Sequence, residues 1–335
     1  RLHFADVEPV NVRGVDQLPC KLCIVRQGGA DEGVAALLKE LILRAIDHRV
    51  GPHQGSPHVQ PHLRPAGVSV LELDQPQFRA LPRRTAVARA LEVEPGRVDV
   101  GRRVVGEINA GCGVCDLCLA GDPRHCPDRT VLGIKGRDGA HAEYLTLPSR
   151  NLLPVPDAIS NDAAAFVEPL AAAWGITERV PISTDSRVAV IGDGKLGLLS
   201  AMAISLAAPG LTLVGKHASK MALASGYDIE AVNAADIQGL LNAFDVVVEA
   251  SGSESGFASA LDLVRPKGTI VLKSTFHGTP AWEAWRVVVD EISVVGSRCG
   301  RFAPALDLLE ASKITVDGLI SDTLPLADGL RAMEL

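Results

Sequence analysis

Four cysteines in one short loop form the clearest chemical pattern in the chain. The spacing is C-x2-C-x2-C-x7-C, from Cys112 through Cys115 and Cys118 to Cys126. Four thiolates this close in sequence can surround one zinc ion as a tetrahedron, with Zn–S distances of ~2.3 Å. Because four protein ligands leave no open coordination position, such an ion would be structural. Two disulfides or four unrelated thiols are the alternatives, but cysteines this crowded are poorly placed for unstrained disulfides. The spacing therefore predicts a structural zinc site.

A glycine-rich turn in the second half of the chain predicts a dinucleotide site. The apolar run from Arg187 to Ile191 leads directly into G-D-G-K-L-G, and an apolar helical segment, Leu198 to Ala208, follows. This is the G-x-G-x-x-G pattern in its required strand–turn–helix setting. The first glycine permits a tight turn, the second lets the backbone approach a pyrophosphate, and the third allows close helix–strand packing. The predicted cofactor contacts are Gly192, Gly194, Lys195, Leu196 and Gly197; a glycine-rich loop without a ligand is the alternative.

The end of the following strand bears on the choice of nicotinamide cofactor. An NAD site usually has an Asp or Glu there, about 20 residues past the glycines, to bind the ribose 2′-hydroxyl. This chain has Gly215 instead, followed by Lys216, His217 and, further on, Lys220. A missing carboxylate and nearby cationic groups favour the 2′-phosphate of NADP over NAD. Lys216 and His217 are therefore predicted to bind NADP, although solvated basic residues in a loop would give the same sequence.

Strands and helices must hold these two sites in place. Between residues 96 and 155, short apolar runs alternate with glycines, which is typical of β-strands flanking the cysteine loop. From about residue 156, strand-like and helix-like segments alternate, with further strands expected over 211–214, 245–249 and 269–272. This alternation predicts an α/β fold with a doubly wound parallel sheet.

Together these features resemble the zinc-containing medium-chain alcohol dehydrogenase family. The resemblance runs from about Val98 to the end, and rests on the cysteine loop, the glycine turn, Gly139-Ala140-His141-Ala142-Glu143-Tyr144 and Glu168-Pro169-Leu170-Ala171. It implies a GroES-like β-barrel catalytic domain joined to a Rossmann domain. It also implies hydride transfer between an alcohol and a nicotinamide cofactor at a catalytic zinc.

The resemblance implies the following domain boundaries. Residues 1–155 form the catalytic domain with the structural zinc lobe, although 1–95 are atypical; 156–292 form the NAD(P)-binding Rossmann domain; 293–335 are a truncated return to the catalytic domain. By the same analogy and by topology, residues 248–252, 273–275 and 297–299 are expected to line the cofactor cleft at the ends of strands.

The resemblance carries one catalytic-zinc ligand onto this sequence. Glu168, in the Glu-Pro-Leu-Ala segment, is implied to be a ligand or an exchanging ligand; otherwise it is a glutamate favoured by the positive end of a helix dipole. The family's other ligands lie in C-G-[TSN]-D and G-H-E segments, and neither string occurs here. The position expected for His-Glu reads Arg83-Arg84-Thr85-Ala86.

Three hypotheses address this departure in the first ~90 residues. Surrogate ligands could come from Cys20, Cys23 or the histidines His48, His53, His58 and His62, but their irregular spacing among prolines and glycines is not typical of a metal site. The domain could instead have diverged and lost its zinc chemistry. We favour a third hypothesis, a shifted reading frame in GC-rich DNA, which yields Arg/Pro/His-rich text. Finding C-G-x-D and G-H-E in another frame of the same DNA would support it.

Composition limits the kinds of partner. With 335 residues, 47% hydrophobic and 22% charged, the chain has material for two domains. A net charge of -7 argues against nucleic acid or an anionic membrane as the main partner. No uninterrupted apolar run has the length of a membrane span. Clustered thiols with no visible secretory signal predict the cytoplasm, and the family resemblance implies a homodimer or homotetramer.

The sequence therefore predicts a zinc-dependent alcohol or polyol dehydrogenase that transfers hydride between an alcohol and NAD(P). It would hold a structural zinc and a second, catalytic zinc. The alternative is a catalytically inactive NADP-binding protein that retains only the structural zinc. A nucleic-acid-binding zinc ribbon is opposed by the acidic balance of the chain and the lack of a basic, aromatic face.

Overall fold

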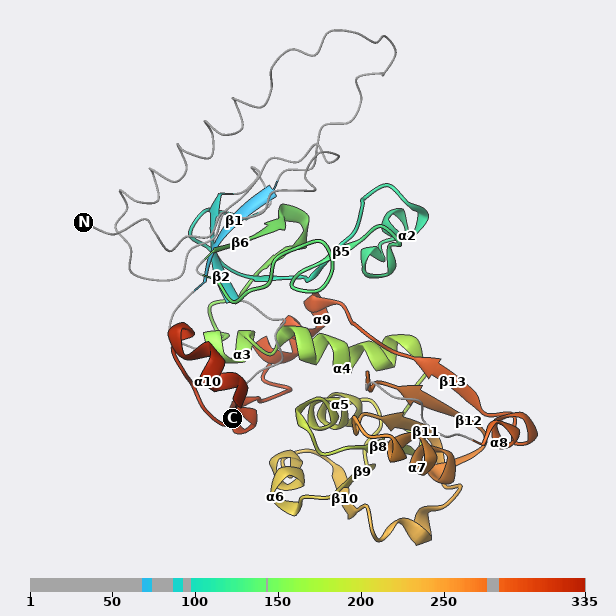
Figure 1. Ribbon diagram of the computed structural model, residues 1–335. Coiled ribbons are helices and arrows are strands. Elements are labelled where there is room, and N and C mark those ends of the chain that lie inside the picture. The colour runs from blue at the N-terminus through green and yellow to red at the C-terminus, as the bar shows by residue number, and fades with distance from the viewer. Residues whose placement is uncertain (1–67, 74–86, 93–97, 143, 276–282, 335) are drawn as a thin grey trace, which may run out of the picture.

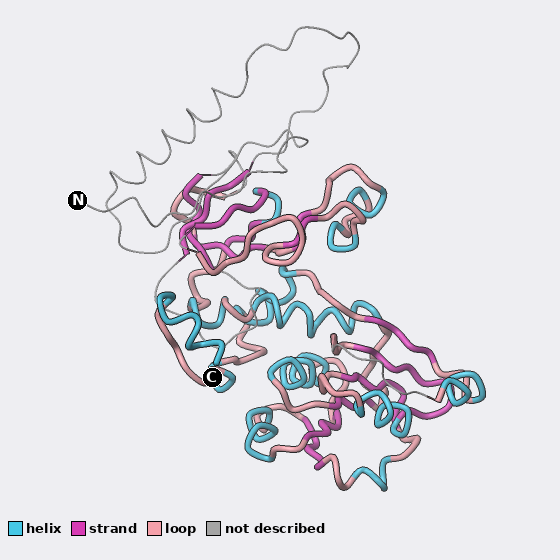
Figure 2. The backbone as a smooth tube through the Cα atoms, viewed as in Figure 1, coloured by secondary structure: helices cyan, strands magenta, loops and turns pink. Residues whose placement is uncertain are grey.

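Two large sheets of different kinds form the framework of the molecule, and two short strands, β4 (Asn109–Ala110) and β5 (Thr130–Val131), pair with each other as a third. The computed structural model describes residues 68–73, 87–92, 98–142, 144–275 and 283–334. An antiparallel sheet lies on one side of helix α4 (Val167–Arg179), and a parallel sheet lies on the other (Figure 1). Figure 2 shows the same division, with short helices around the parallel sheet and long loops around the antiparallel one.

The antiparallel sheet has five strands in the order β6-β1-β2-β3-β7. In β6, Leu145 and Leu147 are buried while their neighbours Tyr144 and Thr146 are only partly so, which is the period of two expected for a sheet with one face in a core. A small core that also contains Val104 and Leu152 packs against that face. The strands are β1 (Val68–Leu73), β2 (Val87–Glu92), β3 (Arg103–Gly106), β6 (Tyr144–Pro148) and β7 (Leu152–Pro154).

This sheet extends into the stretch that the sequence marked as atypical. Strand β1 pairs with β6, with Leu71 opposite Leu145, and β2 pairs with β3, with Val87 opposite Val105. Residues 68–73 and 87–92 therefore belong to the same sheet as the strands predicted between 96 and 155. The candidate surrogate ligands (Cys20, Cys23, His48, His53, His58, His62) and the segment 83–86 lie outside the described residues.

The parallel sheet has six strands in the order β10-β9-β8-β11-β12-β13. Numbered from β8, this is the order 3-2-1-4-5-6 of the Rossmann fold, and every pairing is parallel. The predicted strands are confirmed, and β10 and β13 at the two edges were not predicted. The strands are β8 (Val188–Ile191), β9 (Leu211–Gly215), β10 (Ile229–Asn233), β11 (Phe244–Glu249), β12 (Val264–Leu272) and β13 (Ser293–Gly296).

Helix α5 (Lys195–Ser205) follows the glycine turn directly. The sequence predicted a helix from Leu198, but the helix begins three positions earlier because extended Gly194 serves as its N-cap. It ends before Pro209, which cannot continue a helix. The other described α-helices are α2 (Asp116–Leu119), α3 (Asn161–Ala164), α6 (Ala218–Met221), α7 (Ser255–Leu263), α8 (Ala284–Val289), α9 (Phe302–Glu310) and α10 (Gly329–Glu334). None of the described helices is long and apolar enough to cross a membrane.

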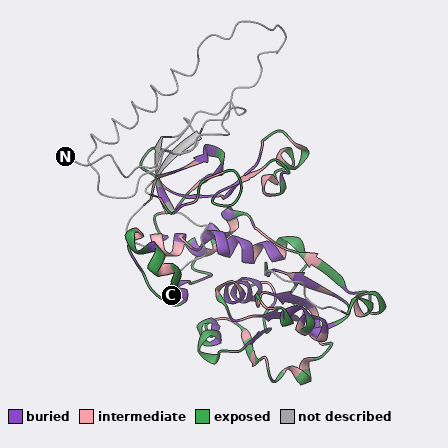
Figure 3. Cartoon of the chain, in the orientation of Figure 1, coloured by how far each residue is buried: buried purple, intermediate pink, exposed green. Residues whose placement is uncertain are grey.

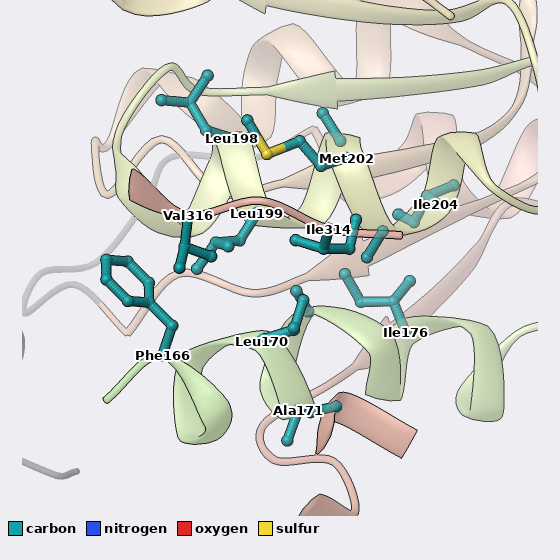
Figure 4. Packing of buried hydrophobic residues seen from close by; sticks show 14 of the residues in the cluster. Phe166, Leu170, Ala171, Ile176, Leu198, Leu199, Met202, Ile204, Ile314 and Val316 are labelled. Carbon is teal, nitrogen blue, oxygen red and sulfur yellow. The ribbon is translucent and has the colours of Figure 1, made fainter. Parts of the chain in front are cut away.

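The largest core surrounds α4 and reaches both sheets. Leu170 and Ile176 of α4 belong to one buried cluster with Leu199 and Ile204 of α5 (Figure 4). The same cluster includes Val105 of the antiparallel sheet. Figure 3 shows α4 as a largely buried helix in the middle of the molecule. The two sheets are therefore joined by a continuous apolar core.

Helix α4 also lies in backbone contact with the segment that precedes α9. A Cβ atom on Gly300 would lie 1.7 Å from the carbonyl oxygen of Ala171, and one on Gly175 would lie 2.9 Å from the Cα of Gly300. Only glycine permits two backbones to approach this closely. The C-terminal segment is thus fixed against the helix that separates the sheets.

Candidate functional site

The four cysteines converge on one point. Their Sγ atoms all lie within 4.8 Å of one another, and all four are free thiols. A tetrahedral zinc with Zn–S distances of ~2.3 Å would separate the sulfurs by ~3.8 Å, so small adjustments would let this set hold an ion. Within the described part of the chain, no other group of three or more potential ligands comes together in this way.

The cysteine lobe, residues 112–126, has almost no apolar interior. Cys126 is its one buried residue, and Val114, Leu117 and Leu119 are all exposed. The lobe contains α2 and a short 3-10 helix, η2 (Pro123–His125), and extends away from the sheet (Figure 1). A loop without a core needs another source of stability, and a metal cross-link supplies it. The burial pattern therefore fits a structural metal.

The thiols of the lobe differ in their ionisation. The N–H groups of Val114 and Cys115 donate to the Cys112 sulfur at 3.5 and 3.4 Å and lower the pKa of Cys112 to about 7. Burial raises the pKa of Cys118 to about 12. Since the thiolate is the form that binds zinc, occupation of the site would release the Cys118 proton.

The glycine turn has the geometry that a dinucleotide requires. Gly192 has φ +119°, and Cβ atoms on Gly192 and Gly197 would lie 2.6 Å from the Ala250 carbonyl oxygen and 2.0 Å from the Gly192 carbonyl oxygen, respectively. A Cβ on Gly194, by contrast, would meet nothing within 4 Å. Gly194 therefore faces open space at the N-terminus of α5, where the N–H groups and the helix dipole favour an anion such as a pyrophosphate. Lys195 and Leu196, both half-buried, lie in the first turn of that helix.

Lys216 and His217 contact an aspartate to which the sequence had assigned no role. Their backbone N–H groups donate to Asp193 Oδ2 at 2.8 and 2.6 Å, and His217 Nδ1 lies 2.9 Å from the same oxygen. Burial alone would raise the pKa of Asp193, but the His217 and Lys216 donors outweigh it and hold that pKa below its usual value. A carboxylate from the glycine turn therefore lies at the end of β9.

Glu168 lies buried in the first turn of α4. Its negative charge lies close enough to Lys273, directly after β12, to raise the pKa of that lysine. Lys273 is 4% exposed, and its Nζ donates to the Arg298 carbonyl at 2.9 Å and to Ser297 Oγ at 3.3 Å. Burial lowers the pKa of Lys273 to about 8, although the charges of Cys299 and Glu168 act in the opposite direction. The structure thus groups Glu168 with segments 273–275 and 297–299.

A polar network connects this group to the cysteine lobe. Arg298 donates to Asn109 Oδ1 at 3.1 Å and to the carbonyl of Arg124, inside the lobe, at 2.7 Å. Asn109 Nδ2 in turn donates to Glu107 Oε1 at 2.9 Å, and burial raises the pKa of Glu107. The sequence analysis missed Glu107, Asn109 and Asp193. For Asp193 the one available signal was its position directly after a predicted parallel strand, where doubly wound sheets bind ligands. Glu107 and Asn109 lie at the end of the strand predicted over 102–108, which carries no such signal.

Comparison with known proteins identifies the family to which this chain is similar. Residues 76–157 match the model of the alcohol dehydrogenase GroES-like domain, and residues 201–311 match that of zinc-binding dehydrogenases. The first match begins at residue 76, so the family pattern starts earlier than Val98, where the sequence resemblance began. The GroES-like and Rossmann parts of the predicted fold are thereby confirmed.

The chain is similar to characterised and structurally known dehydrogenases. D-arabinitol dehydrogenase 1 of Uromyces fabae is 28% identical over 267 residues, which is 75% of each chain. A protein of Sinorhizobium meliloti 1021, assigned as a zinc-binding dehydrogenase and bound to NADP, is 25% identical with a TM-score of 0.63, over 77% of this chain and 84% of that one. The rspB alcohol dehydrogenase of E. coli CFT073, complexed with NADH, shares the fold at 24% identity and a TM-score of 0.66, over 75% and 78%.

These relatives are oxidoreductases, so they give no support to the alternative of an inactive NADP-binding protein. The NADP-bound protein of Sinorhizobium meliloti 1021, at 25% identity, supports a nicotinamide cofactor for this family without choosing between NAD and NADP. Both matching family models, the strand order and the relatives agree. The chain belongs to the zinc-containing medium-chain alcohol dehydrogenase family.

Proposed function

We propose that this chain is a zinc-dependent polyol or alcohol dehydrogenase that uses a nicotinamide cofactor. The observation that carries the proposal is the common location of two sets of residues. The open glycine turn follows β8, and Lys273 follows β12. The charge of Glu168 lies close enough to Lys273 to raise the pKa of that lysine, against the effect of burial. Both strands belong to the same parallel sheet, whose carboxyl edge is where doubly wound folds bind their ligands. Similarity to an arabinitol dehydrogenase supports a polyol as the substrate class.

The residues of the chain have distinct tasks in this mechanism. A bound nicotinamide cofactor would supply hydride exchange with the substrate carbon, and a catalytic zinc would supply polarisation of the substrate oxygen. The N–H groups at the start of α5 hold the pyrophosphate, and the missing side chain of Gly194 admits it. Glu168 would supply one carboxylate ligand for the catalytic metal; among the described residues, the one group of three or more potential ligands is the four cysteines. Cys112, Cys115, Cys118 and Cys126 hold the structural zinc.

The sequence-based prediction of NADP over NAD rests on Gly215, Lys216 and His217. In the structure, the backbone N–H groups of Lys216 and His217 donate to the carboxylate of Asp193. A ribose bound beside these residues would therefore meet a negatively charged group. We further propose a cytoplasmic homodimer or homotetramer, on the family resemblance and the clustered free thiols. Light scattering coupled to size-exclusion chromatography tests the assembly.

The experiment combines zinc content with turnover on a panel of polyols and simple alcohols. Wild-type protein is expected to hold about two zinc ions per chain and to reduce the cofactor with at least one polyol. Glu168→Gln is expected to lose one zinc and the activity. The matched control is Glu310→Gln, the same exchange at an exposed position at the end of α9, which should keep both. Glu168→Gln with unchanged zinc and turnover, or zinc-loaded wild type that oxidises nothing in the panel, would overturn the proposal.

A further inference from the structure

Position 215 lacks an acid because the space for its side chain is already filled. A Cβ atom built on Gly215 would lie 2.7 Å from the Cβ of Asp193, 2.9 Å from Asp193 Oδ2 and 2.7 Å from Met221 Sδ. Gly215 does not have a positive φ, so backbone conformation does not demand glycine there. The neighbour that excludes a side chain is itself an aspartate. The carboxylate expected at the end of β9 is therefore supplied from the glycine turn.

Asp193 is firmly held in this place. Oδ2 receives the N–H groups of Lys216 and His217 at 2.8 and 2.6 Å, and His217 Nδ1 approaches at 2.9 Å. The Asp193 side chain is 12% exposed, and all three contacts involve Oδ2. Among the described residues no donor reaches Oδ1, so this oxygen can accept one from a ligand. The site lies between the first two glycines of the turn, beside the place predicted for the pyrophosphate.

We infer that Asp193 binds the adenosine ribose and makes NAD, not NADP, the cofactor of this chain, an inference that rests on the proposed function. The 2′-hydroxyl of NAD can donate to Oδ1, as it does to the acid at the end of the second strand in other NAD sites. The 2′-phosphate of NADP would bring a second negative charge against a carboxylate that is already ionised. The backbone donors that could have received that phosphate are already used by Asp193.

The basic residues nearby do not compensate. The residues from Lys216 to Lys220 are all exposed, so the lysine charges are solvated and screened. His217 Nδ1 lies 2.9 Å from Asp193 Oδ2, so this ring nitrogen is already engaged by that carboxylate. A nearly buried negative charge therefore opposes a 2′-phosphate more strongly than exposed positive charges attract it. This inference opposes the sequence-based prediction of NADP, which rests on the missing acid at Gly215.

Binding measurements test the inference without catalysis. The probes are NADH and NADPH, followed by fluorescence, and the adenosine fragments 5′-AMP and 2′,5′-ADP, followed by calorimetry. Wild-type protein is expected to bind the form without the 2′-phosphate at least about tenfold more tightly in both pairs. Equal or tighter binding of NADPH and 2′,5′-ADP would overturn the inference. Failure of all four probes to bind would overturn the proposed function as well.

Two variants separate ribose recognition from a structural role. Asp193→Asn keeps an oxygen that can accept from the Lys216 and His217 N–H groups, but it removes the negative charge. The preference for NADH over NADPH is therefore expected to fall at least about tenfold, largely because NADPH binds more tightly. Asp236→Asn removes the same charge from an exposed position near the same sheet edge and should leave the ratio unchanged. Weakening of NADH and NADPH by the same factor in Asp193→Asn would show that Asp193 only positions the loop, and would refute its role in selectivity.

Discussion

The ammonium group of Lys273 is enclosed by protein and held by two oxygens, the Arg298 carbonyl and Ser297 Oγ. Burial lowers its pKa from 10.5 to about 8. Between these two values the unfolded chain keeps the proton and the native chain has released it. The unfolded state then binds more protons, so the contribution of Lys273 to the free energy of unfolding rises with pH across this window.

The substitution Lys273→Met removes the titrating group at nearly constant length. We expect the free energy of unfolding of wild type, minus that of the variant, to increase by on the order of 3 kcal/mol between pH 8 and pH 10.5. Denaturant unfolding at several pH values measures this difference. Lys267→Met is the control, because Lys267 is 75% exposed and its charge stays in water. A difference that does not change with pH would contradict the assignment of a buried lysine.

Residue spacing was enough to find the cysteines and the glycine turn, because each pattern is local in sequence. It was not enough for Asp193. Its contacts with Lys216 and His217 span more than twenty positions, and only the folded β8–β9 pair brings them together. The lack of an acid at Gly215 is visible in the sequence, whereas the side chain that occupies its space is not. Glu107 and Asn109 were missed for the same reason.

The cysteine lobe is an element without an apolar core, so its stability depends on its ligands. Removing one ligand with Cys115→Ser is expected to lower the zinc content by one ion per chain and to make residues 112–126 accessible to protease. Structural zinc in small fingers contributes about 10–16 kcal/mol of apparent binding free energy, which is far more than this loop can recover through packing. Metal analysis and limited proteolysis measure the two effects.

Cys299→Ser is the matched control for the lobe. Cys299 is a free thiol at the end of β13, and its sulfur lies 3.8 Å from Asn109 Nδ2, outside the cluster of four. This variant should therefore retain all of its zinc. If Cys115→Ser kept the wild-type zinc content, the four sulfurs would not be the ligands of a structural ion.

Strands differ in how well their sequences identify them. The central strands β8 and β11 are almost wholly buried and read as continuous apolar runs, which is typical of parallel strands covered on both faces. The edge strands β10 and β13 were not predicted. Most of their residues are exposed or half-buried, as in Ile229–Asn233. An edge strand is held by hydrogen bonds to only one neighbouring strand and is partly exposed. Its sequence therefore shows little of the apolar pattern from which strands are predicted.

At the scale of the whole molecule, the two sheets are joined through α4 and through the contact between Gly175 and Gly300. Because one buried cluster runs from Val105 to the helices of the parallel sheet, we expect the described parts to unfold in one transition. The backbone of Gly300 rests on that of Ala171, so the C-terminal segment is part of the same unit. A substitution that strains this contact should therefore lower the stability of both sheets.

Gly300→Ala tests this coupling. Its new methyl group would lie 1.7 Å from the Ala171 carbonyl oxygen, and two backbones cannot separate without disturbing the core. We expect a loss of about 3 kcal/mol or more in the free energy of unfolding. Zinc release and loss of NADH binding should shift together to lower denaturant concentration. Gly296→Ala, where the methyl group would meet nothing within 4 Å, should stay within about 0.5 kcal/mol of wild type. Separate shifts of the two probes would show that the sheets unfold independently.

The shared space of Asp193 and Gly215 also restricts how this nucleotide site can change by mutation. Gly215→Asp alone would force its side chain against Asp193, and Asp193→Gly alone would leave the ribose without an acid. Only the double exchange, with Met221 moving aside, restores one carboxylate in the usual position. The two positions should therefore show reciprocal sign epistasis, in which each single change lowers NADH affinity and the pair recovers it. A lineage under selection at every step would be confined to one of the two arrangements, and a library of single substitutions would never reach the other.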